Sequence, residues 1–456
     1  MESANEAAMT YRLLVTRRNA SEILLLPNGL GWVMPRVEIH PHQRLAEQLT
    51  AKVTSAWELE AYCLYAREGE PKCAVMESVR QNDKAPAGTF WVPRTVAEGG
   101  VELNETRLIQ GSLDEFNAAT TNRNAGPLAR PGWLRELYSW AQNKLTPFGM
   151  RLTGGFRQLN ASPTFSLIRL ETDREAVWFK ATGEPNSHEL RVTASLARLF
   201  PGCIPTILAI HQTWNGWLSM EVAGVSLDQL EDFTAWERAA EELAELQIAS
   251  IAKTVELLQA QTKDLRISNL VERIDPFVAR MGTLMGAQEK PQPAPLVRSE
   301  LTTLAEGLKE CCALLESLGL PNTLGHMDFN PGNILLSGDH CVFLDWAEGC
   351  VSNPVLTFEY LREHMARLGI EEPAANERLI AAYLRPWTSF YSPDDLRRAL
   401  ALAPLVAVFA YAVANDSWRS PDLVHQSKLA GYFRSLTRRM YLEAIRVAER
   451  SELCLG

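Results

Sequence analysis

The sequence predicts an α+β protein whose first part is rich in strands and whose second part is helical. Short apolar runs separated by turn residues recur up to about residue 224, which is typical of strands. From about residue 230 onward, apolar residues recur at steps of three or four, which predicts amphipathic helices. The chain has 456 residues, and at roughly 150 residues per domain this predicts about three domains.

Composition places the chain among ordinary globular proteins. Apolar residues make up 46% and charged residues 22%, so disorder is excluded as the dominant state. The formal net charge is −10, and this acidic excess argues against a general nucleic-acid-binding protein, which needs clustered Lys and Arg. The charge is compatible with a cationic small-molecule substrate but does not show one.

The cysteines, the N-terminal residues and the apolar runs of the sequence indicate the cellular compartment of the protein. The eight cysteines form no C-x-x-C pair and have no His cluster near them, so we expect neither a zinc site nor a disulfide framework. The first residues, MESANEAAMTYR, lack the basic-then-apolar pattern of a signal peptide. The longest apolar run, 399–414, is shorter than the ~20 residues that span a bilayer, and it predicts a buried helix. We therefore expect a cytoplasmic protein without membrane contact.

Residues 1–116 predict a small N-terminal α+β domain. Its expected strands lie near 11–16, 22–26, 61–66, 74–79 and 89–92, with a helix from residue 43 to about 57. Residues 117–146 predict a polar linker over 117–130 and an amphipathic helix over 131–145.

The remaining chain divides into a strand-rich lobe, 147–224, and a helix-rich lobe, 225–456. In the first, 165–171 and 176–181 flank a turn and predict a hairpin. In the second, apolar periodicity predicts helices around 240–258 and 301–318, separated by a proline-rich surface loop over 288–295.

The segment 324–349 carries the strongest chemical pattern. Two apolar runs, 334–336 and 341–344, flank turn residues and predict a hairpin that pairs Leu336 with Cys341 and Ile334 with Phe343. Asn333 and Asp345 then stand side by side where the strands leave the far end of the hairpin. The Pro331-Gly332 bend can fold Asp328 back over the same point, so three oxygen-bearing side chains converge.

Such a cluster suits magnesium and phosphate. Mg²⁺ takes oxygen ligands and usually binds one or two carboxylates together with substrate phosphates. Asn333 and Asp345 could supply protein oxygens, which leaves Asp328 free to accept the proton of an attacking hydroxyl. The alternative is a polar loop that caps a hairpin, with Asp328 as a turn or helix cap. The combined pattern, rather than any single Asp, favours the phosphate chemistry.

The motif His326-Met-Asp328-Phe-Asn-Pro-Gly-Asn333 resembles the catalytic loop of the aminoglycoside phosphotransferase and choline kinase-like family. Leu344-Asp345-Trp346 resembles that family's metal-binding strand end. The resemblance implies a bilobal protein-kinase-like fold, with Mg²⁺ and with ATP or GTP as the phosphate donor. It implies Asp328 as catalytic base, Asn333 and Asp345 as metal ligands, and His326 as a scaffold residue. One departure is Thr357, which stands where the family usually has Asp after its Pro-x-x spacing.

The strand-rich lobe holds the candidates for nucleotide binding. Alternation along 176–181 points Lys180 away from Phe179, and the resemblance implies that Lys180 reaches the α- and β-phosphates. Glu189 could pair with Lys180 at the start of a helix. The rival interpretation of Glu189 is a capping box that begins at Asn186.

Two further segments are weaker candidates. Asn160 and Ser162 lie in a short polar turn of the kind that replaces the glycine-rich phosphate loop in this family, although an ordinary Asx or Pro turn fits equally. Glu221 and Val222 resemble the hinge, where backbone groups bind the base.

The first 110 residues faintly resemble a Nudix hydrolase domain. Nudix chemistry needs Arg-Glu-x-x-Glu-Glu on a helix, and the comparable stretch here, Arg44-Leu-Ala-Glu47-Gln48-Leu49, has one acid where three are needed. We therefore expect a non-catalytic domain that shapes substrate access or recruits a protein partner that the sequence does not identify.

These residues predict a Mg²⁺-dependent phosphotransferase that moves the γ-phosphate of ATP or GTP to a hydroxyl of a small molecule. The alternative is a catalytically silent, kinase-like nucleotide-binding or regulatory module. The presence of Asp328, Asn333, Asp345 and Lys180 together favours the enzyme, because a silent module has no need of all four.

Overall fold

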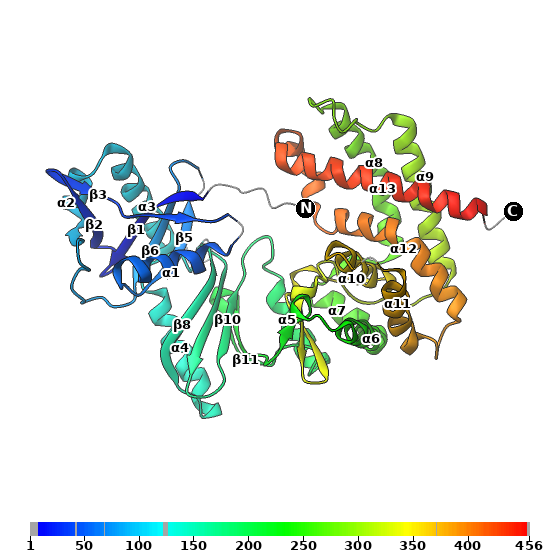
Figure 1. The fold of residues 1–456 in the computed structure, drawn as a ribbon, viewed down its shortest axis with the longest axis horizontal. Coiled ribbons are helices and arrows are strands. Elements are labelled where there is room, and N and C mark those ends of the chain that lie inside the picture. The colour runs from blue at the N-terminus through cyan, green and yellow to red at the C-terminus, as the bar shows by residue number, and fades with distance from the viewer. Residues whose placement is uncertain (1–7, 42, 68, 122–125, 371, 454–456) are drawn as a thin grey trace. The chain divides into compact units, whose positions relative to one another are not determined.

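The computed structural model describes residues 8–41, 43–67, 69–121, 126–370 and 372–453. The chain forms two compact units. The first comprises Met1–Leu190 with Thr206–Glu221, and the second comprises Arg191–Pro205 with Val222–Gly456. Each is described separately below, with element labels as in Figure 1.

The first unit begins with a seven-stranded sheet in which β1 pairs in parallel with β6 and antiparallel with β2 and β4. Its strands are β1 Met9–Arg17, β2 Glu22–Asn28, β3 Gly31–Val33, β4 Arg36–Ile39, β5 Ala61–Arg67, β6 Cys73–Ser78 and β7 Phe90–Pro93. The five strands expected from the sequence are all present. The short β3 and β4 were not expected, because neither has a run of apolar residues.

Alternation along β1 explains how this sheet is covered. Leu13 and Val15 point to one face, where they share a core with Leu49 and Val53 of helix α1, Leu45–Trp57. Leu14 points to the opposite face and joins a second core. The helices on that side are α3, Leu103–Thr121, and α4, Trp133–Leu145, while the short α2, Arg94–Gly100, follows β7.

Residues 117–130, which the sequence predicts to be a polar linker, are partly helical in the structure. Helix α3 continues to Thr121, so the first residues of 117–130 are helical, and Leu128 and Ala129 at its other end are buried. The apolar side chains of Ile109 and Phe116 explain the difference, because they bury one face of α3 in the core of the first unit. Residues 122–125 lie outside the described chain.

The second sheet of the first unit has five antiparallel strands in the order β11-β12-β10-β9-β8. They are β8 Leu152–Ala161, β9 Ser166–Thr172, β10 Val177–Ala181, β11 Ile207–His211 and β12 Gly216–Met220. The predicted hairpin is β9–β10, with Leu170 opposite Val177. Helix α4 packs against this sheet through Trp140, whose ring lies 6.1 Å from that of Phe179. One core therefore extends from the N-terminal sheet through α4 into the second sheet. The separate domains 1–116 and 147–224 remain a prediction.

The second unit is mostly helical (Figure 1). The helices are α5 Glu189–Leu199, which begins in the first unit, α6 Phe233–Ser250, α7 Thr254–Gln259, α8 Ile267–Gly286, α9 Arg298–Ser317, α10 Val355–Arg367, α11 Pro373–Trp387, α12 Pro393–Val413 and α13 Ser427–Leu453. The strands are β13 Val225–Ser226, β14 Lys263–Leu265, β15 Thr323–His326, β16 Ile334–Ser337, β17 His340–Phe343 and β18 Gly349–Ser352.

One predicted helix differs in detail from the structure. The single helix expected over 240–258 is divided into α6 and α7 by a 3₁₀ turn over Ile251–Lys253. Ser250 explains the break, because its hydroxyl donates to the Gln247 carbonyl at 2.7 Å and accepts the Leu324 N–H at 2.7 Å. Helix α12 is the one described helix long and apolar enough to cross a membrane, a criterion that core helices also meet, and 67% of its apolar window is buried in this unit.

Candidate active site

His326, at the end of β15, is fully buried and joins two segments of the second unit. Its Nδ1 accepts the N–H of Asp328 at 3.1 Å, and its Nε2 lies 3.1 Å from the Leu344 carbonyl. Burial lowers the pKa of His326, so the ring is neutral and carries its proton on Nε2, where it donates to Leu344. The ring therefore connects the Asp328 loop to the end of β17, which is the position that a scaffold residue needs.

The Asp328 loop is held by two asparagines. The amide nitrogen of Asn330 lies 3.2 Å from Asp328 Oδ1, while its oxygen accepts the Gly332 N–H at 3.0 Å. The amide nitrogen of Asn333 donates to the Asp328 carbonyl at 3.1 Å. The 3₁₀ turn Pro331–Asn333 makes these contacts possible, because it folds the chain back over Asp328.

The hairpin β16–β17 has the predicted register, with Leu336 opposite Cys341 and Ile334 opposite Phe343. Its ladder extends by one further bond, since the Leu344 N–H donates to the Asn333 carbonyl at 2.9 Å. Asp345 follows at once. The same Asn333 therefore contacts the Asp328 loop through its side chain and the segment before Asp345 through its backbone.

Asp345 adopts a left-handed backbone conformation, with φ of 60°, and starts the 3₁₀ turn Trp346–Glu348. A side chain other than Gly, Asn or Asp is disfavoured in this conformation. The buried Trp346 fixes the turn by donating its indole N–H to the Phe343 carbonyl at 3.1 Å. The sharp change of direction after β17 is therefore built into this segment.

The start of the loop is fixed by close approach between β15 and neighbouring chain segments. A Cβ atom at Gly325 would lie 2.6 Å from Ser352 Oγ and 2.8 Å from Thr357 Oγ1, so no larger residue fits. Thr357, in α10, accepts the His326 N–H at 2.9 Å. Thr357 thus supplies an acceptor for the motif's backbone at the position where the family usually has Asp.

The residues present fit a magnesium ion. Because the amide nitrogen of Asn333 is bound to the Asp328 carbonyl, its oxygen is the atom that can face a cation. This amide oxygen and the Asp345 carboxylate are hard donors, the kind Mg²⁺ prefers. Within the described chain no three His, Cys, Asp or Glu side chains gather as a metal cluster. With these two protein donors, a bound Mg²⁺ would take its remaining ligands from phosphates and water.

In the first unit, Lys180 Nζ lies 2.5 Å from Glu189 Oε1. Lys180 comes from β10 and Glu189 from the first turn of α5, so the ion pair that the sequence suggested is present. Alternate residues of β10 are buried, which confirms that Lys180 points away from Phe179. The ammonium group also lies 5.8 Å from the ring of Trp217, on the neighbouring strand β12.

The predicted polar turn connects β8 to β9. The Ser162 N–H donates to the Phe165 carbonyl at 2.7 Å, and the Phe165 N–H donates to Ser162 Oγ at 3.0 Å. Asn160 lies within β8, next to Leu167 in the register. Since the Ser162 hydroxyl accepts a bond within the turn, the geometry is also that of an ordinary Ser turn, and the phosphate role of both residues stays a prediction.

The side chain of Glu221, the hinge candidate, is engaged in hydrogen bonds with neighbouring strands. Its carboxylate accepts from Arg169 at 2.6 and 2.8 Å and from the Trp178 indole at 3.1 Å. Hydrogen bonding to Arg169 lowers the pKa of Glu221. Its backbone N–H donates to Ala176, so the Glu221 carbonyl is the group left to bind a base. Val222, the first residue after this contact, belongs to the second unit, and its role stays a prediction.

The roles of three residues were missed by the sequence analysis. Asn330 holds the Asp328 carboxylate, Thr357 holds the His326 backbone, and Arg169 holds Glu221. The position of Asn330 within the motif could have identified it. The other two contacts join segments far apart in the chain, for which the sequence has no local signal.

Residues 187–399 match the family described as the phosphotransferase enzyme family. Over these residues the chain is similar to that family. The match includes Glu189, the Asp328 loop and Asp345, and it begins after Lys180. Together with the five-stranded sheet and the helical part that follows it, the match confirms the predicted α+β, protein-kinase-like fold and a kinase-like phosphotransferase.

Solved structures of phosphotransferases are similar over about two-thirds of the chain. Ethanolamine kinase from Plasmodium vivax has 14% identity and a TM-score of 0.45, over 68% of this chain and 88% of that chain. Choline kinase from Cryptosporidium parvum Iowa II has 12% identity and a TM-score of 0.47, over 70% and 96%. The GDP complex of aminoglycoside 2'-phosphotransferase-IIIa has 16% identity and a TM-score of 0.44, over 65% and 98%. No curated protein sequence matches the chain.

The N-terminal domain lies outside the family match. On helix α1, its one acid in the Nudix-like stretch, Glu47, pairs with Arg157 at 2.6 Å. The resemblance of this domain to a Nudix domain stays a prediction.

Proposed function

We propose that this phosphotransferase moves the γ-phosphate of ATP or GTP to a hydroxyl of a small molecule and requires Mg²⁺. The observation that carries the proposal is the double contact of Asn333. Its side chain binds the Asp328 carbonyl and its backbone binds Leu344, so the candidate base and both candidate metal ligands belong to one hydrogen-bonded loop.

Asp328 is the proposed base. Its carboxylate accepts the proton of the acceptor hydroxyl as that oxygen forms its bond to the γ-phosphorus and the bond to the β–γ bridging oxygen breaks. Asn330 steadies the carboxylate through its contact with Oδ1. His326 remains neutral and keeps the loop at a fixed distance from the segment that ends β17.

Asn333 and Asp345 are the proposed metal ligands. Mg²⁺, when bound, neutralises phosphate charge and orients the nucleotide. The left-handed backbone at Asp345 fixes where its carboxylate leaves the chain, and the Asn333 amide is fixed by its bond to the Asp328 loop. Both ligands are therefore preorganised by hydrogen bonds and turns of this chain.

Lys180 is proposed to bind the α- and β-phosphates, with Glu189 fixing the direction of its ammonium group. The ion pair supports this role, because Glu189 is nearly buried and its carboxylate holds the Lys180 ammonium group at the end of β10. Asn160, Ser162 and the backbone of Glu221 and Val222 complete the proposed nucleotide contacts.

The decisive experiment measures consumption of ATP and of GTP by the full-length protein across a panel of hydroxyl-bearing metabolites, with Mg²⁺ and with EDTA. We expect at least one acceptor to be phosphorylated only with Mg²⁺, and Asp328→Asn to abolish that activity while nucleotide binding is retained. Asp339→Asn is the matched control, since Asp339 lies 90% exposed in the turn of the same hairpin.

Activity of Asp328→Asn at the wild-type level would contradict the assignment of the base. Silence across the whole panel, with nucleotide still bound, would instead favour the regulatory module without turnover.

A further inference from the structure

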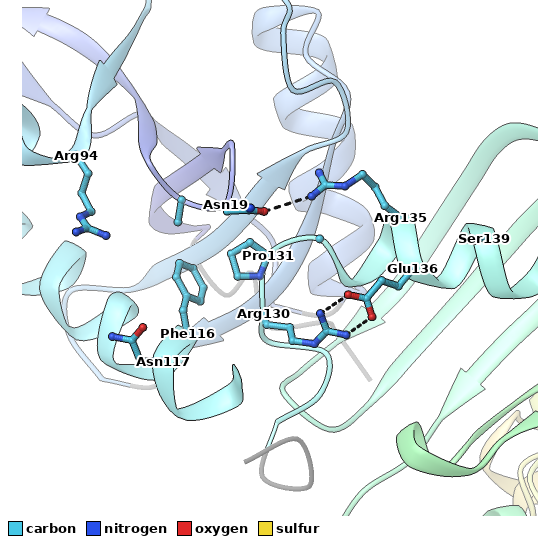
Figure 2. Close-up of a pocket in the computed structure, with 11 residues that line it drawn as sticks. Asn19, Arg94, Phe116, Asn117, Arg130, Pro131, Arg135, Glu136 and Ser139 are labelled. Atoms are coloured by element: carbon cyan, nitrogen blue, oxygen red, sulfur yellow. Dashed lines mark hydrogen bonds and ion pairs between the residues drawn. The ribbon is translucent and has the colours of Figure 1, made fainter. Parts of the chain in front are cut away.

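The first unit contains a cavity of about 600 Å³ away from every residue assigned above. It is lined by the β1–β2 turn and by residues of α2, α3 and the start of α4 (Figure 2). This volume lies within the usual range for small-molecule sites, roughly 300 to 1,000 Å³. All of its lining residues precede the part of the chain that matches the phosphotransferase family.

Three arginines line the cavity, against one acid, Glu136. Arg130 makes a two-pronged contact with Glu136, one bond of which is 2.6 Å long, so these two charges compensate each other. The Arg135 guanidinium donates one hydrogen bond to the Glu77 carboxylate at 3.3 Å and one to the Asn19 side-chain oxygen at 3.4 Å. Both distances are long for hydrogen bonds. The cavity therefore keeps cationic donors whose present partners do not use them fully.

Arg94 gives the clearest indication of a missing partner. Its Nε is buried and has no hydrogen-bond partner within the described residues, although the Glu98 carboxylate lies 3.4 Å away. Arg130 Nε is buried and equally without a partner in the described chain. Buried donors are nearly always hydrogen-bonded in folded proteins, so two unused guanidinium donors beside one cavity indicate a ligand that accepts hydrogen bonds.

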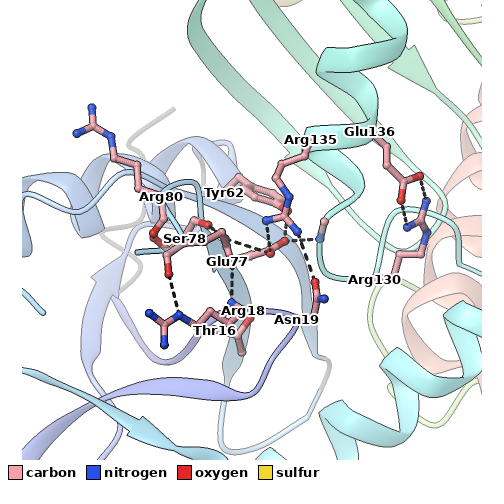
Figure 3. A network of polar contacts seen from close by, with 12 residues as sticks. Thr16, Arg18, Asn19, Tyr62, Glu77, Ser78, Arg80, Arg130, Arg135 and Glu136 are labelled. Atoms are coloured by element: carbon pink, nitrogen blue, oxygen red, sulfur yellow. Dashed lines mark hydrogen bonds and ion pairs between the residues drawn. The ribbon is translucent and has the colours of Figure 1, made fainter. Parts of the chain in front are cut away.

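A hydrogen-bond network around the buried Glu77 lies beside Arg135. Glu77 is completely buried and accepts the hydroxyl of Tyr62, the N–H of Gly132 at 2.6 Å and a contact from Arg135 (Figure 3). Gly132 has a φ of +88°, which favours glycine, and it starts α4. This network holds the N-terminus of α4, the helix that carries Arg135.

Two apolar side chains, Phe116 and Pro131, also line the cavity. We propose that the cavity binds a small organic anion, a phosphate or carboxylate attached to a ring or hydrocarbon body. The acid group binds Arg94, and the body packs against Phe116, which lies near Arg94 in Figure 2. This proposal does not depend on the phosphotransferase activity.

The test is calorimetric titration of the full-length protein with phenyl phosphate and with benzoate, in EDTA so that no Mg²⁺-dependent nucleotide site forms. Inorganic phosphate is a third titrant that lacks the ring. We expect one of the two aromatic anions to bind at one site and inorganic phosphate to bind more weakly. Preference between phenyl phosphate and benzoate identifies the acid group.

Two variants place the binding in the cavity. Arg94→Gln removes the half-exposed guanidinium, and Ser139→Trp narrows the cavity from an exposed position of α4 without touching an ion pair. Each is expected to weaken binding by about tenfold or more. Arg80→Gln is the control, because Arg80 changes the charge equally but is 69% exposed and does not line the cavity. Absence of binding by both aromatic anions, or equal binding by wild type and both cavity variants, would overturn the proposal.

Discussion

The Lys180 ammonium group lies 2.5 Å from the Glu189 carboxylate, and their side chains are only 14% and 2% exposed. An ion pair this shielded from water is more sensitive to loss of either partner than a surface pair, because water compensates a buried charge less than an exposed one. The pair also connects the end of a strand to the start of a helix, which fixes the ammonium group in one direction.

Replacement of Lys180 tests its proposed contact with phosphate. We expect Lys180→Met to lower kcat/KM for phosphoryl transfer by about 10² to 10³, the usual effect of removing one preorganised charge from a reacting group. Glu189→Gln should lower kcat/KM by a smaller factor, because the Lys180 ammonium group is kept and only its orientation is lost. Lys309→Met, which removes a surface ion pair with Asp275, is the control. A kcat/KM for Lys180→Met equal to that of the control would refute the role.

Asn330 tests how the base is positioned. Asn330→Asp keeps an oxygen that can accept the Gly332 N–H but replaces the amide beside Asp328 with a second carboxylate. Like charges raise a carboxyl pKa, so we expect the acid limb of the pH–rate profile to move to higher pH. Asn330→Ala should lower kcat without moving that limb as far. Equal profiles for the wild type and both variants would show that Asn330 has no influence on Asp328.

Asp345 provides a test specific to the metal. Asn tolerates the left-handed backbone found at this position, so Asp345→Asn should fold normally while losing the carboxylate charge. We expect calorimetry to show nucleotide binding weakened by about tenfold or more with Mg²⁺ present, and unchanged in EDTA. Asp339→Asn should behave as wild type in both conditions. Weakening of equal size in EDTA would mean that Asp345 does not act through the metal.

The hairpin β16–β17 was predictable because its sequence signals are local. The turn residues at 337–340 and the flanking apolar runs define the register, and the register places Asn333 beside the segment that precedes Asp345. The helical run from 117 to 121 and the break after Ser250 were not predictable, because each depends on packing or hydrogen bonds with distant segments. Thr357 was noted only as a departure, since its bond to the His326 backbone forms in the folded chain alone.

Glu359, in α10, makes the stability of the second unit depend on pH. Burial raises its pKa to about 7 from an ordinary 4.5, and this effect outweighs the opposing charge of Arg362, whose guanidinium lies 2.6 Å away. Below pH 4.5 the carboxyl is protonated in both the folded and the unfolded chain. Between 4.5 and about 7 the unfolded chain releases the proton while the folded chain keeps it, so the free energy of unfolding falls as pH rises.

Glu359→Gln removes this titration and keeps an oxygen that can accept from Arg362. We expect urea unfolding of the wild type to show a free energy of unfolding that falls by up to about 3 kcal/mol from about pH 5 to about pH 8 through this residue. The variant should lack this component and be the more stable protein at the alkaline end. Glu316→Gln, on α9, is a control for the loss of one carboxylate. The free energies of unfolding of Glu359→Gln and wild type could instead vary with pH in parallel. Glu359 would then ionise as readily in the folded protein as in the unfolded chain, and burial would not control its charge.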